Sequence, residues 1–307
     1  MKAPPDEPST CAPADPTPRP PTFTLPAGAV DCHAHVFLDP RAFPFHQPRS
    51  YTPPPALLEA YCAMHRTLGI ARGVLVQPSV YGDDNSAQAN ALVSLRGKGL
   101  DYRGVAVVRG NVTDAELDRL GRIGFCGVRL NLLFEGGIAW ADVVHLASRL
   151  AERNWHLQCL IDISTFPRLT HRLGNLAVPV VIDHMGHFNA EKGAAHPSFQ
   201  NLLRLLDTGR AWVKLSGAYR LIRQNHPPYS DVQPLAEALV QANPQRLVWG
   251  SDWPHPHIRG AMPNDGHLLD LLAGWAPDQA TRQAILVSNP EALYGFAPVG
   301  QKNGHCR

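Results

Sequence analysis

The sequence has no long hydrophobic run and no block of one charge. No apolar stretch approaches the roughly 20 residues that a membrane-spanning helix requires, so we expect no membrane partner. The 28 Lys and Arg residues nearly balance the 26 Asp and Glu residues, which leaves a formal net charge of +2. Without a cluster of Lys and Arg, the charge pattern gives no reason to expect a nucleic-acid partner.

Cysteine is scarce, and its spacing forms neither a C-x-x-C pair nor a disulfide framework. The six residues are Cys11, Cys32, Cys62, Cys126, Cys159 and Cys306. Scattered cysteines favour reduced thiols and a cytoplasmic location over a disulfide-stabilised secreted scaffold. We assign no nucleophilic role to any of them.

After residue 27, short β-rich runs alternate with helical patterns. The runs read AVDCHAHV, ARGVLVQPS, YRGVAVV, FCGVRLN, HLQCLID, VPVVIDH, AWVKLSG and RLVWGSD. Several are almost continuously apolar, which is typical of parallel strands covered on both faces. Helical patterns such as PALLEAYCAMHRTLG and SFQNLLRLLDTG separate them, with leucines three and four residues apart. This order predicts an α/β fold, a (β/α)8 TIM barrel that forms a single domain over residues 27–307.

An open, doubly wound sheet is the alternative architecture. That fold would normally carry a glycine-rich phosphate-binding turn after its first strand, whereas here the first run continues into HVFLDPRAFPF, which has no glycine. Residues after Asn264 are expected to add closing helices, including HLLDLLAGW and ATRQAILVSNPEALYGF. In TDAEL, Thr113 and Glu116 have the spacing of a capping box, which predicts a helix start.

Residues 1–26 precede the predicted barrel and are rich in proline. They read MKAPPDEPSTCAPADPTPRPPTFTLP and hold no apolar core of a secretory signal. Because proline fixes φ and removes a backbone donor, we expect this tail to be disordered or extended. An arm docked over the barrel base or on a partner subunit is the alternative, and a homo-oligomer stays open.

Polar side chains gather at the predicted carboxyl ends of the strands, where TIM-barrel enzymes hold their chemistry. His33 and His35 end the first strand, His184 follows the sixth and Asp252 follows the eighth. A single strand-end histidine is more often structural than catalytic. Four such residues at one end of a barrel predict an active site.

The two-residue period of a strand predicts which side chains of the first strand share a face. Asp31, His33 and His35 should line the barrel interior, with Asp31 the deepest. Cys32 alternates with them, so it should face the surrounding helices.

The constellation resembles the amidohydrolase superfamily, in which H-x-H follows the first barrel strand and Asp the eighth. Within it, the chain is most similar to the amidohydrolase-2 group and to its 2-pyrone-4,6-dicarboxylate lactonases and related lactonases. The matching segments are DCHAHVF, FPFHQPRSYTP, QPSVYGDDN, GVRLN, VIDHMGH, LSGAYR, GSDWPHP and NPEALYGF. They occur in order over nearly the whole chain after residue 29. No carboxylated-lysine bridge is evident after the fourth strand, where the sequence reads VRLN.

The resemblance implies hydrolysis of a small anionic lactone. Asp252 would act as the general base on the attacking water. His33, His35 and His184 would stabilise the oxyanion that develops on the ring carbonyl. Lactonases of the dicarboxylate type do this without a metal, so no cofactor is favoured. A site with one Zn²⁺ per chain, held by these four residues, is the alternative.

Two arginines and several loop residues are candidates for substrate contact. Arg129 and Arg220 could bind a substrate carboxylate through paired guanidinium donors. The remaining candidates are Tyr51, Ser79, His187, Trp253 and His255. Trp253 could form a wall over the ring.

The match to the dicarboxylate lactonases fails just after the fourth strand. Their further basic residue is replaced by Glu135 in VRLNLLFEGG. A carboxylate there would repel a second substrate carboxylate. A muconolactone-type substrate with one carboxylate, or a sugar-acid lactone, therefore fits better than the pyrone dicarboxylate.

Other function classes use the same site residues. A lactone isomerase and a zinc-dependent decarboxylase or hydratase of the same group are the enzymatic alternatives. A non-enzymatic binding barrel would be expected to lack Asp252 or one of the histidines in the first strand, and the sequence keeps them all.

Overall fold

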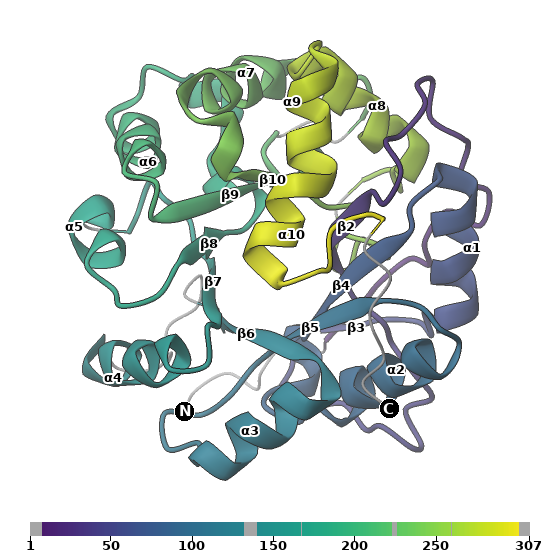
Figure 1. The fold of residues 1–307 in the computed structure, drawn as a ribbon. Coiled ribbons are helices and arrows are strands. Elements are labelled where there is room, and N and C mark those ends of the chain that lie inside the picture. The colour runs from purple at the N-terminus through teal and green to yellow at the C-terminus, as the bar shows by residue number, and fades with distance from the viewer. Residues whose placement is uncertain (1–7, 132–139, 167, 223–225, 259, 301–307) are drawn as a thin grey trace, which may run out of the picture.

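The computed structural model describes residues 8–131, 140–166, 168–222, 226–258 and 260–300. Eight strands form one sheet in the order β10-β9-β8-β7-β6-β5-β4-β2, and every ladder in it is parallel. The strands are β2 (Val30–Ala34), β4 (Arg72–Val76), β5 (Tyr102–Ala106), β6 (Phe125–Asn131), β7 (His156–Leu160), β8 (Val180–Ile182), β9 (Ala211–Leu215) and β10 (Leu247–Trp249). Helices surround them (Figure 1). The predicted (β/α)8 barrel is confirmed.

The helices follow the strands as the leucine spacing predicts. They are α1 (Leu58–Leu68), α2 (Ser86–Gly97), α3 (Asp114–Ile123), α4 (Trp140–Ala151), α5 (Leu169–Gly174), α6 (Pro197–Asp207), α7 (Gln233–Ala242), α8 (Asp265–Trp275), α9 (Gln279–Gln283) and α10 (Asn289–Tyr294). At the start of α3, the Thr113 side chain accepts a hydrogen bond from the Glu116 backbone N–H at 3.2 Å. No helix within the described ranges is long and apolar enough to cross a membrane.

The barrel is closed between β10 and β2 by the segment that follows β10. The Asp252 backbone N–H donates to the His33 carbonyl at 2.8 Å, and the His35 N–H donates to the Trp253 carbonyl at 2.7 Å. Gly250 lets the two segments approach, because a Cβ there would lie 2.6 Å from the Cβ of His33. The closing contacts therefore fix the candidate base beside the candidate histidines.

The predicted alternation along β2 is wrong at its centre. Asp31 does not line the interior, because its Oδ2 lies 3.2 Å from Nε2 of His65 on α1. Cys32 packs inside the barrel instead of facing the helices. The register against β4 shifts between Asp31 and Ala34, where three steps of β2 match two of β4. This β-bulge turns two successive side chains, Cys32 and His33, to the interior.

Apolar side chains fill much of the barrel interior on the side away from the carboxyl ends of the strands. A separate buried cluster there consists of Val30, Cys32, Val74, Val76, Val105, Val181, Trp212, Val248, Tyr294 and Phe296. Tyr294 belongs to α10, which lies across the ring of strands in Figure 1. These side chains close that end of the barrel, and the pocket described below lies at the end where the strands reach their carboxyl termini.

Residues 8–26 form an extended arm along the outside of the barrel. β1 (Ser9–Thr10) pairs in parallel with β3 (Tyr51–Thr52). Further along, the Thr22 backbone N–H donates to Oδ1 of Asp270 on α8 at 2.6 Å. Arg19 forms an ion pair with the same carboxylate at 2.5 Å. The arm therefore contacts both β3, near the start of the barrel, and α8, near its end.

Candidate active site

A pocket of about 130 Å³ brings together most of the predicted site residues. Its lining consists of His35, Ser50, Tyr51, Ser79, Arg129, Asn131, Leu160, His184, His187, Arg220, Asp252, Pro256 and His257. The residues come from the ends of several strands and from the loops that follow them. This is where barrel enzymes place their active sites.

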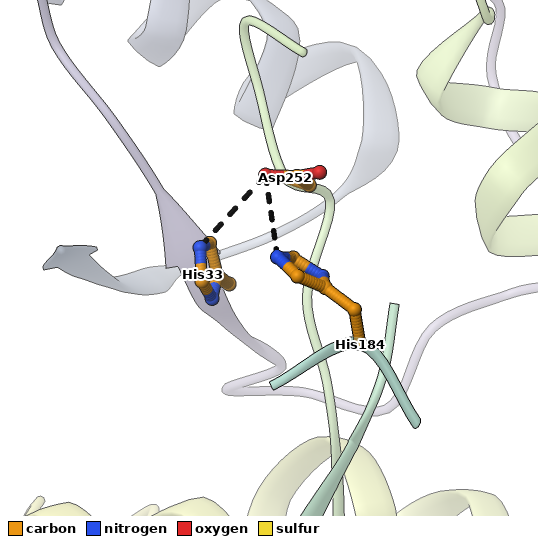
Figure 2. A group of neighbouring side chains, drawn as sticks. All are labelled: His33, His184 and Asp252. Atoms are coloured by element: carbon orange, nitrogen blue, oxygen red, sulfur yellow. Dashed lines mark ion pairs between the residues drawn. The ribbon is translucent and has the colours of Figure 1, made fainter. Parts of the chain in front are cut away.

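Asp252 stands at the centre of the predicted histidines. Its Oδ1 atom lies 3.8 Å from Nε2 of His33, 3.9 Å from Nε2 of His35 and 3.9 Å from Nε2 of His184. Figure 2 shows the Asp252 carboxylate facing the rings of His33 and His184. Within the described part of the chain, Oδ1 is buried and has no hydrogen-bond partner. A buried oxygen of this kind calls for a ligand, a water or an ion.

The other carboxylate oxygen is fully occupied. Oδ2 of Asp252 accepts hydrogen bonds from the Tyr219 hydroxyl at 2.5 Å and from Nε of Arg220 at 2.6 Å. Burial, the largest single influence, would raise the pKa of Asp252, but the Arg220 guanidinium and the other neighbouring groups together hold that pKa well below its usual range. Asp252 is therefore ionised at neutral pH, with its free oxygen toward the histidines.

The imidazoles of His33, His35 and His184 each have a polar contact at Nδ1, and all three are neutral at neutral pH. Nδ1 of His35 contacts the Val76 carbonyl at 2.7 Å, and Nδ1 of His184 contacts the Ser216 hydroxyl at 2.8 Å. Burial lowers the pKa of His33, and it lowers the pKa values of His35 and His184 well below their usual range. All three Nε2 atoms face Asp252, which leaves them able to donate hydrogen bonds or to ligate a metal according to their tautomer.

The same residues could hold a metal ion. His33, His184 and Asp252 each offer one ligand atom, and these atoms lie within 4.8 Å of one another. Two imidazole nitrogens and a carboxylate oxygen are a common zinc donor set. The unpartnered Oδ1 atom fits such an ion as well as it fits a water molecule.

Several site residues have left-handed backbone. The φ angle is 67° at Asp252, 49° at His184 and 47° at His187. Such conformations cost on the order of 1–3 kcal/mol each in a residue with a side chain, and they concentrate at functional sites. They turn the chain sharply after β8 and β10 and aim these side chains into the pocket.

Both predicted arginines line the pocket, but each also pairs with a buried acid. Arg129 lies 3.3 Å from Oδ2 of Asp183 through its Nε. Arg220 binds Asp252, as described above, and its Nη2 donates to the Pro256 carbonyl at 3.0 Å. Sequence reasoning foresaw neither acid as a partner. The two ion pairs therefore fix the orientation of the Arg129 and Arg220 guanidinium groups before any substrate binds.

Tyr51 links the pocket to the N-terminal arm. It is buried, which raises its pKa to about 12, and its ring stacks on His257 at 5.4 Å between centroids. The His257 backbone N–H donates to Sγ of Cys11, and its ring Nδ1 lies 3.3 Å from the Ser9 hydroxyl. The arm thus supports two lining residues. Ser79, a predicted substrate contact, also lines the pocket.

His187 lines the pocket beside His184, with 5.1 Å between the ring centroids. Burial lowers its pKa to about 4, so it is a neutral wall residue at neutral pH. The sequence named it as a candidate for substrate contact, and its place in the lining is compatible with that role.

Trp253 and His255 do not line this pocket. Trp253 stacks on Tyr61 with 5.2 Å between ring centroids. Nδ1 of His255 lies 2.9 Å from the Tyr219 hydroxyl, and Nε2 lies 3.2 Å from Asp265. The left-handed turn at Asp252 sends the next side chain outward, so Trp253 forms no wall of the described pocket.

Sequence reasoning missed the polar residues that support the site from below. Lys214 and Gln158 are completely buried in the barrel interior, and Tyr219 is almost so. The signal for Lys214 was present, because a lysine interrupts the apolar run AWVKLSG. A lysine in a strand that is buried on both faces must find partners inside the protein.

Comparisons with known proteins agree with this geometry. The amidohydrolase family model matches residues 30–296. The chain is 37% identical to a 4-sulfomuconolactone hydrolase of Hydrogenophaga intermedia, in an alignment that covers 91% of this chain and 92% of that protein. It is also 37% identical to a 2-pyrone-4,6-dicarboxylate hydrolase of Comamonas testosteroni, over 90% of this chain and 93% of that protein.

A crystal structure of an Agrobacterium tumefaciens protein without ligand superposes with a TM-score of 0.80 at 30% identity. The match covers 91% of this chain and all of that one. With the family model spanning nearly the whole barrel, the chain belongs to the amidohydrolase family.

Proposed function

We propose that the protein is a hydrolase that opens a small carboxylated lactone. One observation carries the proposal: an ionised, buried Asp252 turns a free oxygen toward the Nε2 atoms of three neutral imidazoles, all within 3.9 Å. A water beside that oxygen would be close to a base and to groups that can stabilise negative charge. The Hydrogenophaga and Comamonas relatives are named as hydrolases of a sulfomuconolactone and of a pyrone dicarboxylate, which supports the same reaction class.

Asp252 would act first as base and then as acid. It takes a proton from water as the water oxygen attacks the ring carbonyl, which leaves a tetrahedral intermediate with an oxyanion. Hydrogen-bond donors among the histidines stabilise that oxyanion. The ring C–O bond then breaks, and Asp252 returns the proton to the departing ring oxygen. Tyr219 and Arg220 hold Oδ2 throughout, so Oδ1 stays directed at the water.

The pocket wall supports an anionic substrate. Arg129 and Arg220 would bind its carboxylate, and Tyr51 and Ser79 would donate hydrogen bonds. Glu135, on which the choice between one and two carboxylates depends, lies outside the described residues. We propose a substrate with one carboxylate, of the muconolactone or sugar-acid type. The Hydrogenophaga relative acts on a sulfomuconolactone by its name.

We propose that the reaction needs no metal. The donor atoms of His33, His184 and Asp252 fit zinc, and His35 lies beside them. Zinc, when bound there, would polarise the carbonyl and acidify water. The test is elemental analysis of protein purified without added metal, followed by lactone assays before and after chelator. Substoichiometric metal with chelator-resistant turnover supports the proposal. One zinc per chain, with activity lost on its removal, would favour the zinc-dependent hydrolase, decarboxylase or hydratase.

Asp252→Asn tests the reaction itself. The substitution keeps the shape of the side chain and removes the base, so lactone turnover should fall by about a thousandfold or more. Asp142→Asn, at an exposed position of α4, is the matched control and should behave as wild type. Products are identified by NMR, since an open-chain acid indicates hydrolysis and a rearranged lactone indicates isomerisation. Near-normal turnover by the Asp252 variant would refute the mechanism.

We further propose a cytoplasmic location. The described cysteines, Cys11, Cys32, Cys62, Cys126 and Cys159, are all free thiols. Reduced thiols are typical of that compartment.

A further inference from the structure

A buried lysine lies directly behind the candidate site. Lys214, on β9, is completely buried, and the reaction proposed above does not use it. Its Nζ donates to Oε1 of Gln158 at 2.8 Å and lies 3.3 Å from Oδ1 of Asp183. Its third contact, at 3.1 Å, is Nδ1 of His33. This last contact determines what His33 can do, because a lysine donates hydrogen bonds and a ring nitrogen can either donate or accept.

The proton positions on the two histidines of β2 follow from a fixed acceptor. Nδ1 of His35 lies 2.7 Å from the Val76 carbonyl, and a carbonyl oxygen can only accept. His35 therefore carries a proton on Nδ1. Among the described residues no carboxylate lies within hydrogen-bonding distance of its Nε2, since Oδ1 of Asp252 is 3.9 Å away, so Nε2 keeps a lone pair. Nε2 of His33 lies 3.3 Å from that lone pair. For the two nitrogens to attract each other, His33 must carry its proton on Nε2 and donate it to His35.

The Nδ1 atom of His33 is then an acceptor. Two groups compete for it: Lys214 at 3.1 Å, which can donate, and Asp183 Oδ1 at 3.3 Å, which is a carboxylate and can only accept. Only the lysine satisfies an Nδ1 lone pair. The bonds form one directed chain in which Lys214 donates to His33, His33 donates to His35, and His35 donates to the Val76 carbonyl.

We propose that Lys214 is a positioning residue that keeps the proton of His33 on Nε2, the ring nitrogen that faces Asp252. In this tautomer Nε2 of His33 is a hydrogen-bond donor and has no lone pair for a metal, while Nε2 of His35 is an acceptor and cannot itself stabilise an oxyanion. To ligate an ion through Nε2, His33 must carry its proton on Nδ1 instead. Nδ1 would then donate a hydrogen bond to Asp183, and Lys214 would lose its acceptor. The tautomer stands on the contacts alone, whereas its use in stabilising an oxyanion rests on the proposed function.

Nitrogen NMR of the wild-type protein tests the tautomer without any substitution at Lys214. The two neutral tautomers of histidine give different couplings between ring protons and ring nitrogens. Metal-free, ¹⁵N-histidine-labelled protein should show His33 protonated at Nε2 and His35 protonated at Nδ1. The His33 signals are assigned by their loss in His33→Asn. A proton on Nδ1 of His33 in the wild type would overturn the proposal.

Lys214→Met then removes the donor while filling a similar volume. His33 should shift to the Nδ1-protonated form with Asp183 as acceptor. Zinc alone, titrated into the variant, should bind on the order of tenfold more tightly than to wild type, since no lysine contact must break. An unchanged His33 tautomer in the folded variant would overturn the proposal, and so would unchanged or weaker zinc binding.

Ser216→Ala is the matched control. It removes the hydroxyl behind His184 and leaves Lys214 in place, so the His33 signals should stay those of the wild type. The activity readout is separate: lactone kcat should fall about tenfold in Lys214→Met, with KM little changed. If the His33 tautomer changes in Lys214→Met but the wild-type protein opens no lactone, the role of Lys214 is supported and the proposed reaction is refuted.

Discussion

Arg220 serves the candidate base, and it also faces the pocket. Its Nε is committed to Oδ2 of Asp252, while its side chain forms part of the lining. The guanidinium group can therefore orient the base through one nitrogen and present others to an anionic substrate. Because it counteracts the burial of Asp252, it also decides over which pH range the carboxylate is ionised.

Arg220→Gln should change both binding and pH dependence. We expect kcat/KM for an anionic lactone to fall about a hundredfold. Without the guanidinium, burial should raise the pKa of Asp252. Since the base works only when ionised, activity on the acid side should be lost at higher pH than in wild type. The measurement is a pH profile of kcat/KM for both proteins.

The control for this substitution is Arg122→Gln, at an exposed position of α3. Its profile should overlay that of the wild type. An acid limb that does not move in Arg220→Gln would show that the ion pair does not govern the ionisation of Asp252.

At the scale of elements, the contact between β2 and the segment after β10 decides the site geometry. The bulge in β2 turns His33 inward beside Cys32, and Gly250 lets the Asp252 segment approach it. Pattern reasoning predicted the strands themselves, since apolar runs mark them. It did not predict the bulge, because a register shift depends on how two separate strands pair and not on the amino-acid composition of either strand.

Gly250→Ala should disrupt this contact. The added Cβ would lie 2.6 Å from the His33 Cβ and 2.9 Å from its backbone nitrogen, so the two segments must separate. We expect a loss of about 1–3 kcal/mol in the free energy of unfolding. Lactone turnover should fall with it, because Asp252 moves away from the histidines. Both are measured on the purified variant, by urea unfolding and by assay.

Gly274→Ala provides the comparison within the same protein. A Cβ at Gly274, in α8, would have no atom within 4 Å, and alanine favours a helix over glycine by up to about 1 kcal/mol. This variant should be as stable as wild type or slightly more so. If both alanine variants behave alike, close packing at Gly250 is not what sets the barrel closure.

For the whole molecule, the sequence predicts the barrel and most of the pocket. It does not predict the buried hydrogen bonds and ion pairs that join side chains from several strands. Repeated apolar runs and helical spacing identify the fold. His33, His184 and Asp252 could be placed together because strand ends meet at one rim. The contacts of Lys214 with Gln158 and Asp183 could not, since they join β9 to β7 and to the end of β8 inside the barrel.

Stability should fall in mild acid, partly because of a histidine far from the pocket. His156 begins β7, and burial lowers its pKa to about 3. An unfolded chain has a histidine pKa of about 6.5. Below that pH the unfolded state takes up a proton that the folded state does not, so the free energy of unfolding falls, by up to about 1.4 kcal/mol per pH unit for one such group.

His156→Phe should therefore weaken the pH dependence. Urea unfolding at pH 7 and at pH 5 gives the difference for each protein, and this difference should be smaller in the variant. His145→Phe, at an exposed position of α4, makes the same chemical change and should leave the dependence as in wild type. Equal pH dependence in all three proteins would mean that His156 is not a source of acid sensitivity.

The N-terminal arm has a practical consequence for anyone who attaches a reporter or an affinity tag. Ser9 and Cys11 touch His257, which lines the pocket, whereas Tyr294 and Phe296 near the other terminus fill the opposite end of the barrel. A fluorophore attached at position 9, through Ser9→Cys, would lie close to His257 and should respond when a ligand enters the pocket. A bulky group at the same position would risk obstructing entry, so labels there should be small.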